Sequence, residues 1–445
     1  MTEEEYGVLK RLICRLLRLE LVEDETGDLV AGTARRSSGD KQSETMVVVT
    51  DEALRAHVNK LGEVSIDGGL DYVTANHYER AVRFDSRRAW LIRDERSESV
   101  LSTSDLLNGI TYELGLSSFE HCLTLLMRYS MLLERGQVDN APRLLARRGP
   151  YRPGWEDDEG AVGSVPWETM IRNALRLTSV KVTSNKALPQ TKLKELADAY
   201  AFTLMYRTGE CIGEFQDIED ALSYGSVRHG IRRGTNDMDT PPAMTYEKDV
   251  IDYYSLALSS DDVYVRYISF YHVLEFHFER VFRKEMSQLL RDMIVRPDFS
   301  YTSDAKLYGV VKAISKEIRA THDRGFGNEE KELGYVLKAY VNMAHLRTRI
   351  EEIERGAQEF YERDKCPFTQ KKTTVDWSSD DDALKAIVKR VYETRNALIH
   401  SKDRDDTNSY RYRPYKDEKK LRKELPLIQA LAEQVIIGSG KVLRV

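Results

Sequence analysis

The second half of the chain repeats apolar residues at the spacing of an amphipathic α-helix, and this periodicity constrains its fold more than any other feature. Similar patterns cover 262–290, 305–321, 333–361, 381–399 and 417–437. In the fourth of these, apolar side chains stand three, four, seven and fourteen positions after the first, at Leu384, Ile387, Val388, Val391 and Leu398. Such a stripe is typical of a helix that packs along one face. Because the links between the patterns are short, we expect an antiparallel helical bundle.

One guanidinium interrupts the stripe of 381–399. Arg395 lies four residues after Val391 and seven after Val388, on the face that is expected to pack. Burying this cation among aliphatic side chains is costly unless an anion meets it. His400, whose imidazole titrates near neutrality, follows five residues later, where the chain leaves the helix. An arginine that holds a phosphate and a histidine that moves a proton are a pair suited to phosphodiester cleavage.

The residues 395–400, Arg-Asn-Ala-Leu-Ile-His, resemble the R-x4-H motif of the HEPN superfamily, the small helical domains of many prokaryotic defence and toxin ribonucleases. The tract 271–275, Tyr-His-Val-Leu-Glu, is similar to the first long helix of the defence-type members, and the resemblance extends over about 249–437. It implies a metal-independent endoribonuclease without a cofactor, of the kind that acts in abortive infection. Such an enzyme cuts tRNA or other RNA and leaves 2′,3′-cyclic phosphate and 5′-hydroxyl ends.

Four residues are the expected catalytic set. Arg395 would hold the scissile phosphate and stabilise its developing charge. His400 would act as general base on the ribose 2′-hydroxyl or as acid toward the leaving oxygen. Asn396 would hydrogen-bond the phosphate or the backbone, and Glu275, on or beside the buried face of its helix, would orient Arg395. Each has a structural alternative, because arginine and glutamate also form plain ion pairs and polar residues also end helices.

Helical geometry separates the two motif residues. Five residues at about 100° each turn the chain through about 500°, which leaves His400 about 140° away from Arg395 on a continuous helix. Either the helix unwinds after Leu398, or two copies build a shared cleft. HEPN ribonucleases dimerise, so the resemblance implies a homodimer or a larger assembly through the C-terminal helical domain.

The segment after the motif carries a local excess of positive charge. Between 401 and 424, nine Lys or Arg stand against six Asp or Glu. Aromatic and basic residues alternate there, which suits stacking on unpaired bases together with phosphate contacts. We therefore predict RNA binding by Lys402, Tyr410, Arg411, Tyr412 and Arg413. A solvated loop of the same composition is the alternative.

Composition excludes several classes of protein. With 445 residues the chain is long enough for two or three domains, and its net charge of −6 requires any RNA contact to be local. No apolar run approaches the roughly 20 residues that span a bilayer. The acidic start is unlike a signal peptide, and the four scattered cysteines lack metal-ligand spacing. We expect a cytoplasmic protein with no membrane segment, metal or cofactor.

The first 240 residues predict a mixed α/β domain. We expect helices at 3–21, 166–177 and 193–206, a mainly helical stretch at 104–135, and strands at 45–50, 179–183 and within 80–92. The Pro- and Gly-rich stretch 149–163 is a candidate boundary within this half, and 226–245 is the expected linker. The predicted fold class is α+β, with a sensing or regulatory domain at 1–240 followed by an all-α effector domain at 249–445.

Two functions remain open from the sequence. The leading interpretation is a dimeric endoribonuclease whose N-terminal domain recognises a phage-derived trigger. The alternative is a non-catalytic helical module for binding or assembly. A second arginine–histidine pair, Arg266 and His272, lies in mid-helix among core aromatic residues, and we interpret it as structural.

Overall fold

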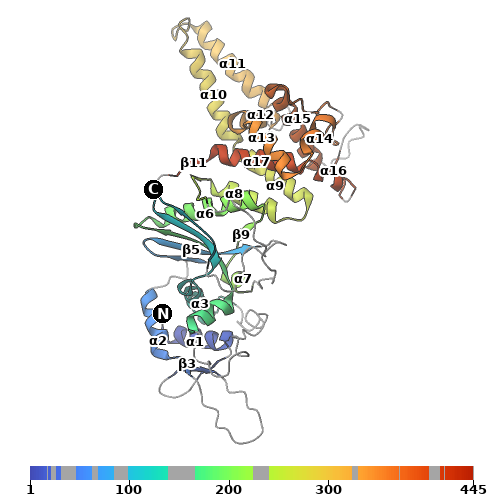
Figure 1. The fold of residues 1–445 in the computed structure, drawn as a ribbon. Helices are drawn as coiled ribbons and strands as arrows, with labels where there is room; N and C mark the ends of the chain where they lie inside the picture. The colour runs from blue at the N-terminus through green and yellow to red at the C-terminus, as the bar shows by residue number, and fades with distance from the viewer. Residues whose placement is uncertain are drawn as a thin grey trace, which may run out of the picture. The chain divides into compact units, whose positions relative to one another are not determined.

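The chain forms two units, each with its own core. The computed structural model describes residues 1–17, 19–21, 27–31, 47–62, 69–84, 99–138, 166–223, 240–322, 329–369, 371–399, 411–414 and 416–443. The division falls between Pro242 and Ala243, inside the segment that the sequence predicted as the linker (Figure 1). The N-terminal unit contains an antiparallel sheet and the C-terminal unit is helical, which confirms the predicted α+β class.

A six-stranded antiparallel sheet organises the N-terminal unit. Across the sheet the strands follow the order β4 (Asp71–Val73), β5 (His77–Phe84), β8 (Thr178–Ser184), β7 (Ile110–Leu116) and β6 (Ser99–Asp105). The sixth, β9 (Ile212–Glu214), pairs with the end of β5. Because β8 lies between β5 and β7, chain segments from before and after 149–163 build one sheet. The boundary considered at 149–163, a segment outside the described residues, therefore does not divide this unit.

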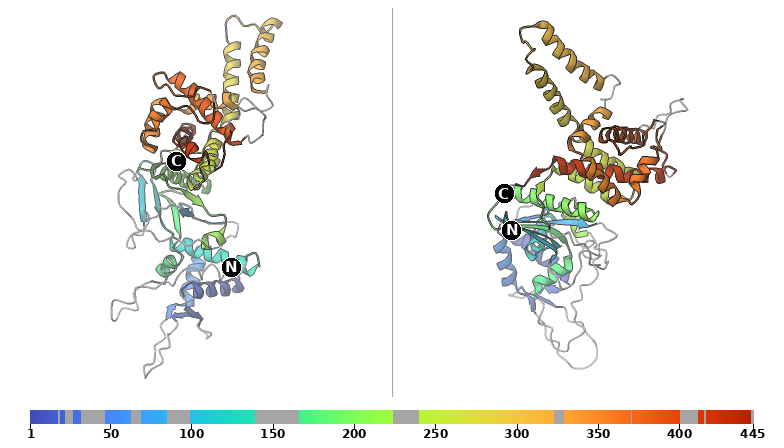
Figure 2. Two further views of the ribbon diagram at one scale, coloured as in Figure 1. Left: turned by 90° about the vertical axis from the view of Figure 1, so that its right-hand side faces the viewer. Right: turned by 45° about the horizontal axis from the view of Figure 1, so that its top comes forward.

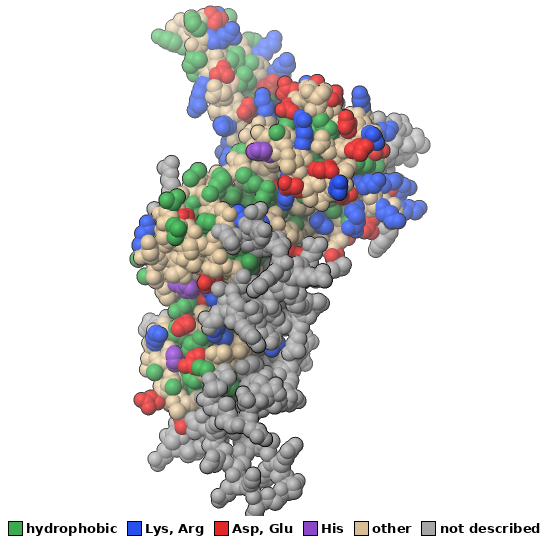
Figure 3. Space-filling view, viewed as in Figure 1, with side chains coloured by type: hydrophobic (Ala, Val, Ile, Leu, Met, Phe, Trp, Pro, Cys, Tyr) green, Lys and Arg blue, Asp and Glu red, His purple; other side chains and the backbone are tan. Residues whose placement is uncertain are grey.

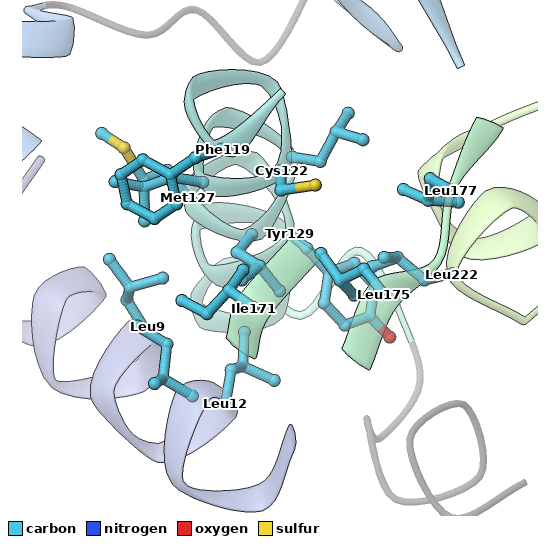
Figure 4. Packing of buried hydrophobic residues seen from close by; sticks show 14 of the residues in the cluster. Leu9, Leu12, Phe119, Cys122, Met127, Tyr129, Ile171, Leu175, Leu177 and Leu222 are labelled. Carbon is cyan, nitrogen blue, oxygen red and sulfur yellow. The ribbon is translucent and has the colours of Figure 1, made fainter. Parts of the chain in front are cut away.

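The helices of this unit cover both faces of the sheet. They are α1 (Glu3–Leu17), α2 (Asp51–Leu61), α3 (Phe119–Glu134), α5 (Trp167–Leu175), α6 (Gln190–Thr208) and α7 (Ile218–Ser223). On one face Tyr200 of α6 packs on Tyr112 of β7, with ring centroids 5.3 Å apart. On the other, His121 of α3 lies 3.3 Å from the buried carboxylate of Glu79 on β5. Leucines of α1 and α5 pack against α3 to form the core (Figure 4).

The prediction of a mainly helical stretch at 104–135 was wrong in its first part. Residues 99–116 form the hairpin of β6 and β7, and only α3 is helical. The turn ends at Gly109, whose φ of 66° is a backbone conformation that suits glycine. Side chains of β7 alternate between buried and partly exposed over most of its length, as expected of a strand. The predicted strands at 179–183 and 45–50 are found, the latter as β3 (Val47–Val49), which joins β1 (Leu19–Leu21) and β2 (Leu29–Ala31) in a small sheet.

The C-terminal unit is a bundle of ten described helices. They are α8 (Lys248–Ser259), α9 (Val263–Glu275), α10 (Phe278–Ile294), α11 (Asp304–His322), α12 (Glu329–Tyr340), α13 (Met343–Ile353), α14 (Ala357–Arg363), α15 (Asp380–Ile399), α16 (Glu418–Arg422) and α17 (Leu425–Ser439). The nearly all-buried α17 packs against α9, α12 and α13. A short antiparallel pair of β10 (Met244–Thr245) and β11 (Lys441–Val442) joins the two ends of the unit. Helices α10 and α11 extend from the bundle as a hairpin (Figure 2).

Three predicted long helices are interrupted in the structure. The stretch 262–290 breaks at Phe276–His277 into α9 and α10, and 417–437 divides into α16 and α17, with Pro426 in the first turn of α17. The stretch 333–361 contains three helices, because Asn342 caps the start of α13 and Gly356, at a φ of 83°, precedes α14. The sequence allowed a bend within 262–290 and a start or kink at Pro426, but not the breaks within 333–361, because the apolar periodicity continues across them.

Candidate functional site

Arg395 lies on the packed side of α15, as the apolar stripe predicted. Its side chain is only 12% exposed. The neighbouring residues Thr394, Ala397 and Leu398 are buried, and the helix ends four residues later at Ile399. The sequence therefore predicted correctly that a guanidinium interrupts a packed helix face, and that an anion would be needed beside it.

The anion that meets Arg395 is Glu329, the first residue of α12. Nη1 of Arg395 lies 2.7 Å from Oε2 of Glu329, and Nη2 donates to Oε1 at 3.0 Å. The pair therefore has one charge-assisted hydrogen bond and one close charge contact, and Oε2 of Glu329 is buried without a hydrogen-bond partner among the described residues. The carboxylate is itself only 18% exposed. Sequence reasoning missed Glu329, because no local pattern joins two residues 66 positions apart.

Two further residues complete the surroundings of the guanidinium. Asn396 accepts a hydrogen bond from Nη1 through its Oδ1, at 3.3 Å, so this predicted site residue does contact Arg395. The guanidinium also stacks over the ring of Tyr271 on α9, 5.4 Å from its centroid. Nε of Arg395 is buried and has no hydrogen-bond partner among the described residues. Burial raises the pKa of the Tyr271 hydroxyl well above its usual range.

Glu275 lies near this group but makes a different contact. Its Oε2 is 2.8 Å from Nδ1 of His272, one turn earlier on α9. The hydrogen bond from His272 lowers the pKa of the Glu275 carboxyl, and the positive charge of Arg395 lowers it further. The prediction that Glu275 orients Arg395 was wrong about the direct partner, which is Glu329. Glu275 acts on Arg395 only through its charge, and its side chain is 38% exposed rather than packed.

The basic segment beyond the motif returns to the end of α15. The backbone N–H of Tyr412 donates to the carbonyl of Ala397 at 2.9 Å, which brings 411–414 beside the last turn of the helix. Arg411 and Arg413 are exposed, and Arg413 forms an ion pair with Asp417 at 3.2 Å. In Figure 3, Lys and Arg side chains gather over this end of the bundle, near α16. The structure thus places a positively charged surface next to the helix that carries Arg395.

Tyr412 lies against two aromatic rings, and its predicted role in RNA binding stays a prediction. Its ring centroid lies 5.9 Å from that of Tyr264 and 6.3 Å from that of Phe368. Because two aromatic neighbours already contact the ring, it is poorly placed to stack on a base. His400, Lys402 and Tyr410 lie outside the described residues, so their predicted roles stay predictions.

A second arginine on α15 has a structural task. Arg390 is fully buried and forms a bidentate pair with Glu424, with Nε 2.7 Å from Oε2 and Nη2 2.8 Å from Oε1. Its Nη1 donates to the backbone carbonyls of Asp364 and Thr373. Every nitrogen of this guanidinium therefore has a partner within the protein. Arg395 differs, because its buried Nε has no hydrogen-bond partner among the described residues.

Other kinds of site find no support in the described residues. Within the ranges that the structure covers, no group of three or more His, Cys, Asp or Glu is arranged to hold a metal ion. None of the described helices is long and apolar enough to cross a membrane. Comparisons with protein-family models, with curated proteins and with solved structures found no significant match to this chain.

Proposed function

We propose that the C-terminal unit is a metal-independent endoribonuclease of the HEPN type, which acts as a defence or toxin effector in the cytoplasm. The observation that carries the proposal is the position of Arg395, a largely buried guanidinium near the end of α15 with a basic surface beside it. A largely buried arginine on a helix beside a positively charged surface suits the capture of a phosphodiester.

In the proposed reaction the protein supplies positioning and proton transfer. Arg395 holds the non-bridging oxygens of the scissile phosphate, and Asn396 fixes the guanidinium through the hydrogen bond to its Oδ1. His400, which follows the last residue of α15, moves a proton as general base or general acid. The ribose 2′-oxygen attacks phosphorus and the bond to the 5′-oxygen breaks. The products are a 2′,3′-cyclic phosphate and a 5′-hydroxyl.

Substrate binding requires an exchange at Arg395. Both terminal nitrogens of its guanidinium contact the carboxylate of Glu329, and a phosphate needs the same donors. The RNA phosphate therefore competes with Glu329 for one cation. We propose that the N-terminal unit senses a phage-derived trigger and controls when this exchange occurs.

Substitution of the two motif residues tests the proposed activity. We expect Arg395→Ala and His400→Ala to abolish RNA cleavage in EDTA and toxicity in cells. His400→Ala should unfold close to the wild type, whereas Arg395→Ala should lose at least about 1–2 kcal/mol of stability with its ion pair to Glu329. Arg363→Ala and His345→Ala are matched controls, because both side chains are exposed and lie on other helices of the same unit. RNA ends sequenced from cells should carry 2′,3′-cyclic phosphates with wild type only. A wild-type protein that cleaves no RNA in EDTA, with or without infection, contradicts the proposal.

Mixing inactive variants tests the proposed homodimer. If the arginine and histidine of one cleft come from two copies, a heterodimer of Arg395→Ala and His400→Ala contains one intact cleft. Co-expression should then restore up to about half of the activity of the wild type, because one of two clefts is complete. No restoration, together with a monomeric mass in light scattering, would show that both residues act within one chain.

One observation favours the alternative, a non-catalytic helical module. Arg395 and Glu329 are in direct contact and largely buried, as expected of an ion pair that only joins α12 to α15. In that case the wild type would bind RNA or a protein partner without cutting RNA, and Arg395→Ala would change the stability alone.

A further inference from the structure

A histidine and a glutamate on one turn of α9 form an exposed hydrogen-bonded pair. Nδ1 of His272 lies 2.8 Å from Oε2 of Glu275. The two side chains are 39% and 38% exposed. On its other side the imidazole contacts the ring of Tyr253 on α8, with centroids 5.1 Å apart. The imidazole is therefore held in one orientation while part of it stays open to solvent.

This pair belongs to the surroundings of Arg395. Tyr271, the residue before His272, lies under the Arg395 guanidinium. The charge of Arg395 also acts on the Glu275 carboxyl, as the lowered pKa of that carboxyl indicates. The turn of α9 that contacts Arg395 through Tyr271 thus also carries the imidazole of His272 and the carboxylate of Glu275. The sequence interpretation of His272 as structural stays a prediction; the structure shows that its side chain is partly exposed and paired with Glu275.

The hydrogen bond determines what His272 can do. When Nδ1–H donates to the carboxylate, the lone pair of a neutral imidazole is on Nε2. Among the described residues nothing forms a hydrogen bond with Nε2 of His272. A carboxylate behind an imidazole fixes its tautomer and stabilises the imidazolium that forms when Nε2 takes a proton. Two other histidines of this unit have described side chains, and both differ from His272. His277 is fully buried, and His345 is exposed without a carboxylate partner among the described residues.

We propose that His272, oriented by Glu275, is the general base for an RNA phosphate bound at Arg395. This inference rests on the proposed ribonuclease function and deepens it, because it assigns the proton acceptor to a residue outside the motif. Nε2 of His272 takes the proton of the ribose 2′-hydroxyl, and the 2′-oxygen forms a bond to phosphorus. The bond from phosphorus to the 5′-oxygen breaks, and the departing oxygen receives a proton from water.

Two RNA substrates distinguish whether His272 acts as the general base or as the general acid. The first is a short RNA with one scissile linkage. The second carries sulfur in place of the bridging 5′-oxygen at that linkage, so that a thiolate departs without needing a proton. We expect His272→Ala and His272→Gln to lower the single-turnover rate about 10²- to 10⁴-fold on both substrates. Glu275→Gln should give a smaller loss, also on both. His345→Ala is the control and should match wild type.

Binding measurements show whether a lower rate of His272→Ala comes from the chemical step or from weaker RNA binding. A 2′-O-methyl version of the RNA cannot be cut, and we expect His272→Ala to bind it as tightly as wild type while Arg395→Ala binds it more weakly. Recovery of the His272→Ala rate on the sulfur substrate would overturn the assignment as base. A wild-type rate for both His272 variants, with Arg395→Ala inactive, would overturn the inference and leave the proposed function intact. A wild-type protein that cleaves neither substrate overturns both.

Discussion

The guanidinium of Arg395 shows which part of a site can be predicted from spacing. Its position in an apolar stripe predicted that it would be buried beside an anion, and the structure confirms both. The identity of the anion was not predictable, because Glu329 stands 66 residues earlier and begins another helix. The sequence instead predicted Glu275 as the partner, because its spacing places it on or beside the buried face of its helix. In the structure Glu275 pairs with His272. This contact could not be predicted from the sequence, because the pattern does not show which face of α9 is partly exposed.

At this scale we predict that Glu329→Gln exposes Arg395 to phosphate. Neutralising the carboxylate weakens the ion pair, so the affinity for a 2′-O-methyl RNA should rise about tenfold, equivalent to about 1.4 kcal/mol. The free energy of unfolding should fall by about 1–2 kcal/mol, because a largely buried pair loses its charge-assisted hydrogen bond. Titration by fluorescence anisotropy and urea unfolding measure the two effects. Glu359→Gln, which disturbs an exposed pair with Arg363, serves as control. An affinity that falls together with stability would mean that Glu329 positions Arg395 for its ligand.

Among the elements, the break between α9 and α10 is a feature whose position could not be located from the apolar periodicity. Tyr267, Tyr271 and Phe278 continue one apolar stripe, but the last two are on different helices. At the break His277 is fully buried. Its Nδ1 accepts a hydrogen bond from Nη2 of Arg280 at 2.7 Å, and its ring meets Tyr340 of α12. Burial, with a contribution from the charge of Arg280, lowers the pKa of His277 from 6.5 to about 4.

This histidine should make the bundle sensitive to acid. The unfolded chain binds a proton at His277 below pH 6.5, whereas the folded chain does so only near pH 4. The stability that His277 contributes is therefore present above pH 6.5 and is lost as the pH falls from 6.5 toward 4. In His277→Asn the amide oxygen can still accept from Arg280 but does not titrate. Urea unfolding at pH 7.5 and pH 5 should show a smaller loss of free energy for this variant than for wild type. An equal loss in both proteins would assign the acid sensitivity to other groups.

For the whole molecule, the sequence predicted the fold class and the position of the division, because composition and helical periodicity change along the chain. It did not predict the sheet. The sequence predicted β8 as a short strand without indicating its neighbours. Its place between β5 and β7 depends on pairing with strands that lie far away in the sequence. The suggested boundary at 149–163 was wrong for this reason. Local composition indicated a break there, while the pairing that joins the two sides is not local.

The two units should unfold separately. Calorimetry of the full chain is expected to show two transitions, and the fragment 243–445 should reproduce one of them with the same midpoint to within a few degrees. The physical basis is that each unit has its own core, and that the pair of β10 and β11 joins the ends of the C-terminal unit to each other. Circular dichroism of the fragment checks that it is helical. A fragment that aggregates, or a single transition of the full chain, would contradict this independence.

The central place of β8 has a consequence for synthesis on the ribosome. The nascent chain makes β5 and β7 long before it makes β8, which must enter between them. Until residue 184 has left the exit tunnel, each of the two earlier strands presents a bare edge to other polypeptides. Chaperone capture of ribosome-bound chains should therefore be strongest for those that stop between β7 and β8, and should fall sharply once β8 has emerged.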